Sequence, residues 1–533
     1  MRIIAPSTLH LALYGLLAAP LTACSIVAGD QAQGSDGGES AGSASGGGDT
    51  GGASGGDGGL NPGVGQGGAQ DFGLFRQILL AGEIPGPDTI DDVGFFNEHK
   101  LLLPAADCGH DVCLHGLFGQ MGNMITGSNC TTVLLGMNTP IDPETIPRRP
   151  LNLALAIDVS GSMRGDPIDY TRLGLTQMLG SLLPEDRITI VAFSEWADVV
   201  ADGLAGDDPE LQVVIEQLDA DGGTNIYDGL RAAFEAVDAA ADNGMQNRVI
   251  LLSDGVATEG ITASAKILNM AAAYNAAGLN LTTIGLGKDF DVQLMRTLAE
   301  AGSGAFYFLE DPKAVAEVFV EEVEAFLIPL AEDASINFGV TGDYILRGLY
   351  GTKLFTADGQ GAEVEIPSLQ IAHRKDVDDN DKGRRGGGGA ILLELLPAPG
   401  AGAGAQEVGD LHFSYRVPAS DVIIEQEIAV TAPLGPGEPG TFFADASVEK
   451  SFVMLNIFMG FKMAALRAQG GDDLGAINLL NALAANVQIW LEQNPDADIE
   501  DDLFYIDLFR TNIHQRTPQE PQPNPPPEPW PYD

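Results

Sequence analysis

The stretch Leu151-Asn-Leu-Ala-Leu-Ala-Ile-Asp-Val-Ser-Gly-Ser162 decides the fold of this chain of 533 residues. Its apolar part, residues 151–157, predicts a buried strand, and the amphipathic pattern that follows predicts a helix. One carboxylate and two hydroxyls therefore lie on a tight turn at the carboxyl end of a strand: Asp158, Ser160 and Ser162. In an open α/β sheet that edge is where ligands bind. Oxygen ligands suit a hard cation such as Mg²⁺ or Ca²⁺.

Apolar strands and amphipathic helices alternate throughout residues 149–329. This alternation predicts an α/β fold, a doubly wound and mostly parallel sheet with helices on both faces. The predicted strands are 151–157, 188–193, 249–252, 281–285 and 305–308, with a short extra strand near Val199. The predicted helices are 168–183, 209–218, 227–241, 263–277, 292–301 and 314–327.

Two further polar loops fall at the same predicted edge of the sheet. Gly222-Gly223-Thr224-Asn225 lies just before a helix, and Ser253-Asp254-Gly255 directly follows a strand. With the first turn they form a set of five oxygen ligands: Asp158, Ser160, Ser162, Thr224 and Asp254. Two carboxylates and three neutral hydroxyls leave a divalent cation with net positive charge and an open position. An acidic side chain of a partner can complete the shell there.

The order and spacing of these motifs resembles the metal-ion-dependent adhesion site of von Willebrand factor type A (vWA) domains, over residues 149–329. The resemblance implies that Ser160 and Ser162 bind the metal directly, and that Thr224 binds it directly or through water. It implies that the two Asp residues often act through water. Mg²⁺ is the expected cation, with Ca²⁺ and Mn²⁺ as alternatives.

The segments around this region narrow the resemblance. Phe75-Arg76-Gln77-Ile78-Leu79-Leu80, Gly285–Phe290 and Tyr344–Tyr350 are similar to segments of bacterial "calcium-activated chloride channel-like" vWA lipoproteins. In that family, as in the more distantly similar inter-alpha-trypsin inhibitor heavy chains, the vWA domain sits between flanking regions. We therefore expect strands on both sides of it to form one sandwich, with 131–135 pairing with a strand between 334 and 430. No segment after Cys24 is long and apolar enough to line a pore, so no channel is implied.

The N-terminus predicts export and lipid anchoring. Arg2 and the apolar run 11–19 precede Leu21-Thr22-Ala23-Cys24, which resembles a bacterial lipobox. We expect residues 1–23 to be a signal peptide and Cys24 to carry the lipid; an ordinary secretory signal is the alternative. Residues 24–70 are rich in glycine and serine and predict a disordered tether. The expected location is the bacterial cell envelope, at the outer membrane or periplasmic face, with the cell surface as an alternative.

Three cysteines remain after Cys24, namely Cys108, Cys113 and Cys130. In an exported protein this odd number predicts one disulfide and one spare thiol, and the spacing does not choose the pair. A zinc site that also uses His110 and His115 fits no standard ligand spacing.

The remaining regions are assigned by pattern. Residues 71–148 form an N-terminal flanking region, and 330–435 a β-rich region that predicts a sandwich. Residues 436–515 are helical, and the apolar part 452–466 predicts a packed core helix because it is short and contains Lys462. Residues 516–533 predict a Pro-rich disordered tail. In the insert 373–389, the run 376–381 lacks the glycine and glutamate of a calcium loop and predicts a solvated acidic turn.

The net charge of −48 argues against nucleic acid as a partner, because such a surface repels phosphate. No nucleophile elbow, phosphate loop or His-Glu-x-x-His motif is present, so no enzyme is predicted. The leading hypothesis is an envelope protein that binds an acidic group of a protein partner through a divalent cation. The alternative is a scaffold that the metal only stiffens, with partners on the flanking β and helical regions.

Overall fold

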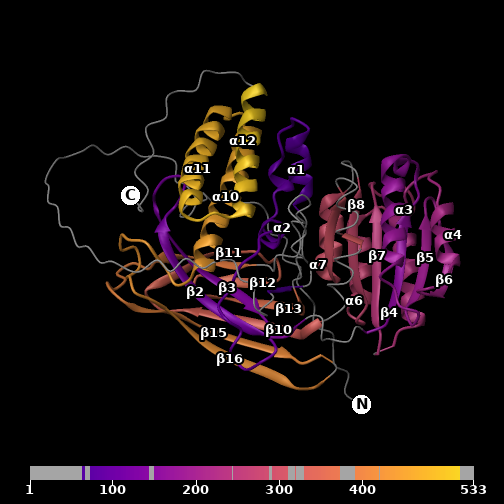
Figure 1. Cartoon of the computed structure of the whole chain (residues 1–533), viewed down its shortest axis with the longest axis horizontal. Helices are drawn as coiled ribbons and strands as arrows, with labels where there is room; N and C mark the ends of the chain where they lie inside the picture. Colours follow the sequence, from indigo (N-terminus) through magenta and orange to yellow (C-terminus); the bar gives the residue numbers. More distant parts are fainter. Residues whose placement is uncertain are drawn as a thin grey trace, which may run out of the picture.

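The computed structural model describes residues 63–66, 72–142, 149–242, 244–286, 291–309, 318–319, 329–371, 390–418 and 420–516. The predictions for the signal peptide, Cys24, the insert 373–389 and the Pro-rich tail lie outside these residues, as does nearly all of the helix expected over 314–327. The described chain forms an α/β body at one side and a body of packed sheets and helices at the other (Figure 1).

The α/β body contains one sheet with the strand order β6-β5-β4-β7-β8-β9. Its strands are β4 (Leu151–Asp158), β5 (Arg187–Phe193), β6 (Ala197–Ala205), β7 (Gln246–Ser253), β8 (Asn280–Leu286) and β9 (Ser303–Leu309). Neighbours are parallel except β6, which is antiparallel to β5. Every residue of β4 is buried, as expected for a central strand covered on both faces. The strand expected near Val199 is therefore a full edge strand.

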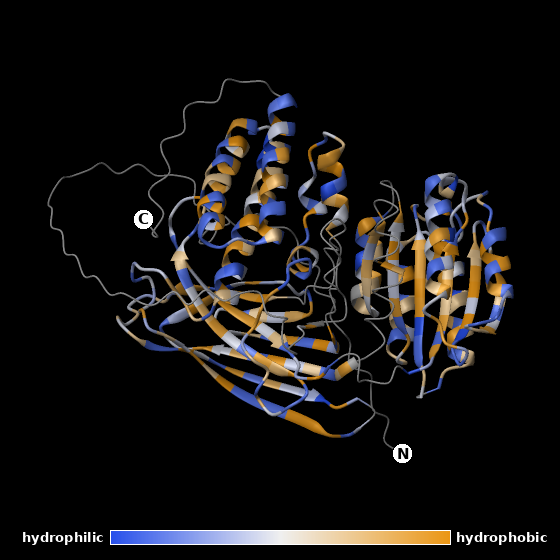
Figure 2. Ribbon diagram, in the orientation of Figure 1, coloured by the Kyte–Doolittle hydropathy of each residue, from blue (hydrophilic) through white to orange (hydrophobic). Residues whose placement is uncertain are grey.

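Helices cover both faces of this sheet. They are α3 (Asp166–Leu179), α4 (Glu210–Gln217), α5 (Ile226–Ala239), α6 (Ser264–Asn275) and α7 (Val292–Ala301). Alternate residues of β4 divide between two cores: Leu153 and Leu155 pack with α3 and α4, and Ala154 and Ala156 with α5, α6 and α7. The central strands are largely hydrophobic along their length (Figure 2). The helix predicted to reach residue 183 ends at 179, where Gly180 caps it.

The second body contains two antiparallel sheets that face each other. Their orders are β1-β13-β10-β15-β16, with β12 beside β13, and β11-β14-β3-β2-β17. The strands are β1 (Val64–Gln66), β2 (Cys113–Gly122), β3 (Asn129–Asn138), β10 (Pro329–Val340), β11 (Tyr344–Tyr350), β12 (Phe355–Asp358), β13 (Gly361–Ile371), β14 (Ile391–Pro397), β15 (Gln406–Arg416), β16 (Ile423–Ala432) and β17 (Phe442–Phe443). Leu135 of β3 lies opposite Ile391 of β14. The predicted pairing of 131–135 with a strand beyond the α/β body is confirmed. The disordered tether predicted over 24–70 is wrong at β1, which pairs with β13 and buries Val64 in the core between the sheets.

Strand β2 has no counterpart in the prediction because its glycines weaken the strand pattern. Close packing between the sheets explains one of them. A Cβ at Gly116 would lie 2.4 Å from Leu411 Cδ1 and 2.9 Å from Val430 Cγ2. Glycine in a strand often marks such a close approach.

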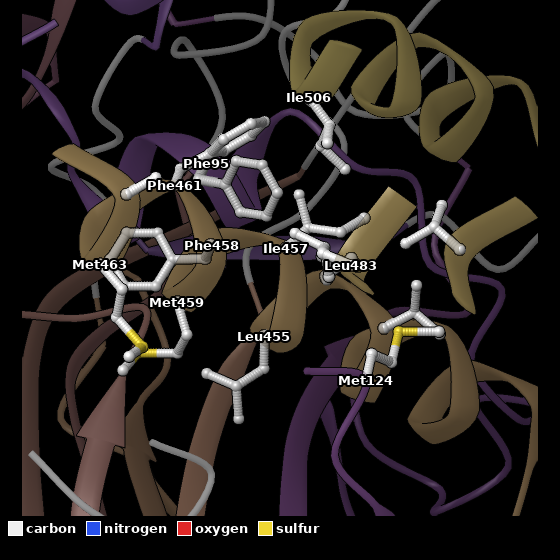
Figure 3. Close-up of a cluster of buried hydrophobic side chains, with 14 of the residues drawn as sticks. Phe95, Met124, Leu455, Ile457, Phe458, Met459, Phe461, Met463, Leu483 and Ile506 are labelled. Atoms are coloured by element: carbon white, nitrogen blue, oxygen red, sulfur yellow. The ribbon is translucent and has the colours of Figure 1, made fainter. Parts of the chain in front are cut away.

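Five helices pack on one of these sheets as a single hydrophobic cluster. They are α1 (Gly73–Leu80), α2 (Asp92–Asn97), α10 (Ala446–Gln469), α11 (Asp473–Gln493) and α12 (Ala497–Arg516), and the single-turn η1 (Pro87–Thr89) precedes α2. Figure 3 shows the ring of Phe461 beside that of Phe95 at the centre of this cluster. Among the described residues, α10 and α11 are long and apolar enough to cross a membrane by composition alone, so the prediction that no segment after Cys24 has that length and apolar character is wrong. The most apolar window of α10 is 83% buried inside the protein, which confirms the predicted core helix.

The structure assigns one of the cysteine pairs that the sequence left open. Cys108 and Cys113 form a disulfide. Cys130 is buried on β3 and is not a free thiol, so the prediction of a spare thiol is wrong for the described residues. The disulfide removes the two thiolates that a zinc site would need, and His115 Nε2 is paired with Asn138 Oδ1 at 2.9 Å.

Candidate metal centre

The first turn of the candidate site follows β4 directly. Asp158 ends the strand and is fully buried. Its Oδ1 accepts a hydrogen bond from the backbone N of Ser160 at 2.8 Å, and its Oδ2 accepts one from Ser253 Oγ at 2.6 Å. Both carboxylate oxygens are therefore held in place, one by the turn and the other by the neighbouring strand β7.

The two serines continue the arrangement toward the surface. Ser160 Oγ lies 3.0 Å from Ser162 Oγ, and Ser162 Oγ donates to Asp254 Oδ1 at 2.8 Å. Asp254 follows β7, so the turn after one strand is linked to the loop after the next. Asp158, Ser160 and Asp254 are buried, whereas Ser162 is exposed. The group therefore opens to solvent on the side of Ser162.

Thr224 completes the group from a third loop. Its backbone N donates to Thr258 Oγ1 at 3.0 Å, and its carbonyl accepts from the backbone N atoms of Thr258 and Glu259. A Cβ at Gly255 would lie 3.4 Å from Thr224 Oγ1 and 3.6 Å from Ser162 Oγ. The hydroxyl oxygens of Thr224 and Ser162 therefore converge beside Gly255. The structure brings together all five residues that the sequence predicted.

Backbone hydrogen bonds fix the loops relative to one another. Gly161 N donates to Gly222 O at 3.0 Å, which joins the first turn to the loop that carries Thr224. Asn225 caps α5 by accepting from Asp228 N, and its own N donates to Ser194 O at 2.7 Å. The position of Thr224 is thus set by a helix cap and by the loop after β5.

The charge of the site is uncompensated at Asp158. Burial raises the pKa of this carboxyl, and the hydrogen bonds from Ser253 and Ser160 lower it only in part. Both of these donors are neutral groups. A buried carboxylate with neutral donors is stabilised when a cation lies nearby.

The donor set fits a hard divalent cation. It offers carboxylate and hydroxyl oxygens from three loops, which suit Mg²⁺, Ca²⁺ or Mn²⁺. In the described part of the chain, no group of three or more His, Cys, Asp and Glu side chains is arranged to hold a metal ion. The hydroxyl-rich group is therefore the candidate metal centre, with Asp158, Ser160, Ser162, Thr224 and Asp254 able to hold the ion.

Three features of the site were not assigned from the sequence. Ser253 orients Asp158, Gly255 leaves room for two hydroxyls, and the turn 194–196 supports Asn225. Asn225 Nδ2 donates to Glu195 O at 3.0 Å, and the next residue, Trp196, is 64% exposed. The position of Ser253 directly before Asp254 could have indicated its role. The support that the turn 194–196 gives to Asn225 depends on a contact between loops that no local sequence pattern indicates.

Residues 152–321 match the family model of the von Willebrand factor type A domain. The uncharacterized protein sll0103 of Synechocystis is 24% identical over 363 residues, which cover 63% of this chain and 78% of that protein. The uncharacterized protein YfbK of Escherichia coli is 29% identical and covers 35% of this chain and 33% of its own length. Inter-alpha-trypsin inhibitor heavy chain H2 of Mesocricetus auratus is 26% identical and covers 37% and 22%. The matches to the last two proteins thus span only a third and about a fifth of their lengths.

Two solved structures are also similar to this chain, at lower sequence identity. A von Willebrand factor type A protein from Catenulispora acidiphila aligns over 77% of this chain and 98% of its own, with 14% identity and a TM-score of 0.44. Proximal thread matrix protein 1 from the mussel byssus, solved with a zinc-occupied MIDAS motif, aligns over 33% and 46%, with 16% identity and a TM-score of 0.28. The zinc is a property of the mussel protein and is not carried over.

Proposed function

Because residues 152–321 form a von Willebrand factor type A domain, a protein-interaction and adhesion module, we propose that this chain binds a protein partner through a divalent cation. The cation would be held by Asp158, Ser160, Ser162 and Thr224 together with Asp254. An aspartate or glutamate of the partner would then complete the coordination shell. Mg²⁺ is the preferred ion, with Ca²⁺ and Mn²⁺ as alternatives.

One observation supports this proposal most directly. The three loops meet at the carboxyl edge of the sheet. Ser160 Oγ lies 3.0 Å from Ser162 Oγ, Ser162 Oγ lies 2.8 Å from Asp254 Oδ1, and Thr224 Oγ1 lies beside Ser162 Oγ at Gly255. Burial of Asp158 among neutral donors favours a cation there, and exposure of Ser162 leaves a side open to a partner. When bound, the ion would supply the positive charge that attracts a partner carboxylate to a strongly acidic protein.

The surface beside the site suits a protein partner. Trp196 is 64% exposed on the turn that supports Asn225, and Val256 is 50% exposed two residues after Asp254. Large exposed apolar side chains beside a polar centre are typical of interaction sites. These two side chains would bury apolar area around a carboxylate bound at the centre.

We propose that the protein acts outside the cytoplasm. The lipobox-like sequence at Cys24 supports a lipid anchor, and the glycine- and serine-rich sequence between Cys24 and β1 supports a flexible connection. The expected place is the bacterial cell envelope, with the binding face held at a distance from the membrane. Transfer of label from radioactive palmitate to the wild-type chain but not to Cys24→Ala would support the anchor. Equal labelling of both would contradict it.

The alternative is a scaffold in which the cation only stabilises the α/β body. The helices of the second body would then carry the partner contacts, and Phe504, 51% exposed on α12, is a candidate. In that case Asp158→Ala would lower the melting temperature without loss of partners, whereas Phe504→Ala would lose them. We propose no catalytic activity, since vWA domains are generally not enzymes.

The test begins with the metal alone. Isothermal titration of the purified protein with Mg²⁺ and Mn²⁺ should show one saturable site. Asp158→Ala should weaken it by at least about 100-fold, since loss of an outer-shell partner alone costs about 10- to 100-fold. Ser162→Ala, at an exposed position, should also weaken binding while leaving the fold intact. Asp238→Ala removes an exposed carboxylate on α5 and is the matched control.

The second step tests the partner. Immobilised protein should retain an envelope protein in Mg²⁺ and release it in EDTA, and the Asp158→Ala protein should retain none. Trp196→Ala should reduce retention while Mg²⁺ binding stays unchanged. Retention that survives EDTA unaltered would show that the cation does not mediate the contact.

A further inference from the structure

A cavity of about 630 Å³ lies where the α/β body meets the second body. It is lined by α7 on one side, by α10 on the other, and by the segment of η1 and α2 between them. The two bodies also touch beside it, because Arg296 of α7 donates from Nη1 to the carbonyl of Asp88 at 3.2 Å. The cavity is far along the chain from the candidate metal residues and shares none of them.

The acidic groups of the cavity are already engaged. Asp92 accepts from Gly351 N at 2.7 Å and pairs with Lys353 Nζ. Asp91 caps α2 through Gly94 N and lies 3.5 Å from the same Lys353 Nζ. The third carboxylate, Asp88, is at an exposed residue. One lysine is thus shared by two aspartates within the wall.

Two other cations in the wall contact backbone carbonyls. Lys462 Nζ donates to Pro87 O at 2.7 Å and to Ile90 O at 3.0 Å. Burial lowers the pKa of Lys462, and the nearby carboxylates of Asp91, Asp92 and Asp88 offset that effect only in part. Arg296 is only 4% exposed and lies over the ring of Phe306, with Cζ 5.5 Å from the ring centroid.

The guanidinium of Arg296 has unused donors. Among the described residues, its Nε and Nη2 are buried without a hydrogen-bond partner. These two nitrogens form one edge of the planar group, the edge that binds a carboxylate side-on through two parallel hydrogen bonds. Buried donors without partners destabilise the folded protein. A bound carboxylate would remove that cost once the side chain of Arg296 turned these buried atoms toward the cavity.

Much of the remaining wall is apolar and adaptable, beside the polar Gln293, Thr297 and Thr352. Phe458, Met459 and Met463 of α10 line it, together with Leu466, 40% exposed, and Phe355 of β12, 38% exposed. Figure 3 shows the side chains of Met459 and Met463 side by side at one edge of the hydrophobic cluster. Methionine side chains follow the shape of a flexible ligand because they are unbranched and polarisable.

We propose that this cavity binds a long-chain carboxylic acid. Its carboxylate would lie at the inner end, between Arg296 and Lys462, and its chain would lie along Met459 and Met463 toward the exposed Leu466. Because the wall comes from α7 and α10, the ligand would also fasten the α/β body to the second body. The cavity matches an amphiphile, since it joins an unsatisfied charged end to an apolar wall within one volume.

The test uses the purified full chain and three probes below their micellar concentrations. Isothermal titration should show saturable binding of dodecanoate. Dodecanol keeps the chain and lacks the charge, and butyrate keeps the charge and lacks the chain; each should bind at least tenfold more weakly.

Variants then locate the site. Arg296→Gln should weaken dodecanoate binding at least tenfold. Thr297→Trp places a large ring at an exposed lining position and should block binding even if Arg296→Gln disturbs the fold. Arg231→Gln changes an exposed arginine of α5 and should bind as the wild type does. Equal affinity for dodecanoate and dodecanol, or unchanged binding in a folded Thr297→Trp protein, would overturn the proposal.

Discussion

The α/β body and the second body differ in how far apart in the sequence their packed elements lie. In the α/β body, parallel strands are joined by helices along the sequence, and the candidate metal site comes from loops that follow neighbouring strands. In the second body, β3 pairs with β14 across more than 250 residues of sequence, and α1 and α2 pack with helices from the far end of the chain. A local sequence motif therefore predicts the α/β body, whereas the second body forms only when segments far apart in the sequence pack together.

The difference also separates two kinds of site. The metal centre uses short polar motifs on rigid strand ends, so its residue types identify it. The cavity at Arg296 is lined by three residues of α7, by residues of α10, and by the segments of η1–α2 and β11–β12. No residue type in that cavity is unusual until the fold brings the segments together.

The largest effect on stability is expected for Phe461→Ala. The ring of Phe461 is 1% exposed and packs among those of Phe72, Phe75, Phe95 and Phe509, on α10, α12 and the segments near α1 and α2. We expect a loss of about 3 to 5 kcal/mol in the unfolding free energy of the second body. Urea unfolding, followed by Mg²⁺ binding for the α/β body, should show that metal binding survives the first transition.

A single unfolding transition, in which Mg²⁺ binding is lost together with the structure of the second body, would contradict this prediction and show that the two bodies unfold as one unit. Phe504→Ala is the matched control, because that ring is 51% exposed on α12. Its effect should stay near about 0.5 kcal/mol, as for most exposed positions.

The next test concerns the packing between the two sheets. Gly116→Ala places a methyl group 2.4 Å from Leu411 Cδ1, so the side chains of Leu411 and Val430 or the sheets themselves must move, at an expected cost of about 1 to 3 kcal/mol. Gly339→Ala on β10 is the control, since a Cβ there meets no atom within 4 Å. Thermal unfolding should lower the melting temperature for the first and leave it nearly unchanged for the second. Equal shifts would mean that the glycines of β2 do not mark close sheet contact.

Helix caps in the two bodies offer a third comparison. Asn225 caps α5 beside Thr224, and Asp445 caps α10 by accepting from Ser447 N at 2.8 Å. Replacing either with alanine should cost about 1 kcal/mol of stability. Only Asn225→Ala should also weaken Mg²⁺ binding, because Asn225 helps to position the loop of Thr224. Loss of Mg²⁺ binding in Asp445→Ala would show that the second body supports the site.

The smallest expected effect is at the surface of the α/β body. Arg231 Nη1 pairs with Glu235 Oε1 at 2.7 Å on α5, and both side chains are substantially exposed. Arg231→Gln should cost about 0.3 to 0.5 kcal/mol at low salt and less at high salt. Urea unfolding at two salt concentrations measures the difference. A loss above about 1 kcal/mol would mean that this pair is part of a larger network.

The sequence predicts the α/β body and the meeting of the five candidate metal residues because both obey local rules. Asp158, Thr224 and Asp254 each lie next to a strand or helix end whose hydrophobic pattern is clear. The predicted ends of the helices are less accurate. Helix α3 ends at Leu179 because Gly180 interrupts a hydrophobic pattern that Leu182 continues.

The second body is predicted only in part. The pairing of 131–135 follows from the vWA resemblance and is confirmed, but strand β2 is hidden by glycines that only the sheet packing explains. The supporting roles of Ser253 and of the turn 194–196 likewise depend on contacts between segments far apart in the sequence. Hydrophobic periodicity describes the face of one element and contains no information about which distant element will cover it.

The placement of the α/β body has a mechanical consequence. The chain leaves the second body after β3 and returns to it at β10. Each of these strands is hydrogen-bonded on both sides, β3 between β14 and β2, and β10 between β13 and β15. A partner that pulls on the α/β body would therefore transmit tension into the interiors of two different sheets at once. Neither strand can be peeled away from an edge, so such a protein should hold its partner under force.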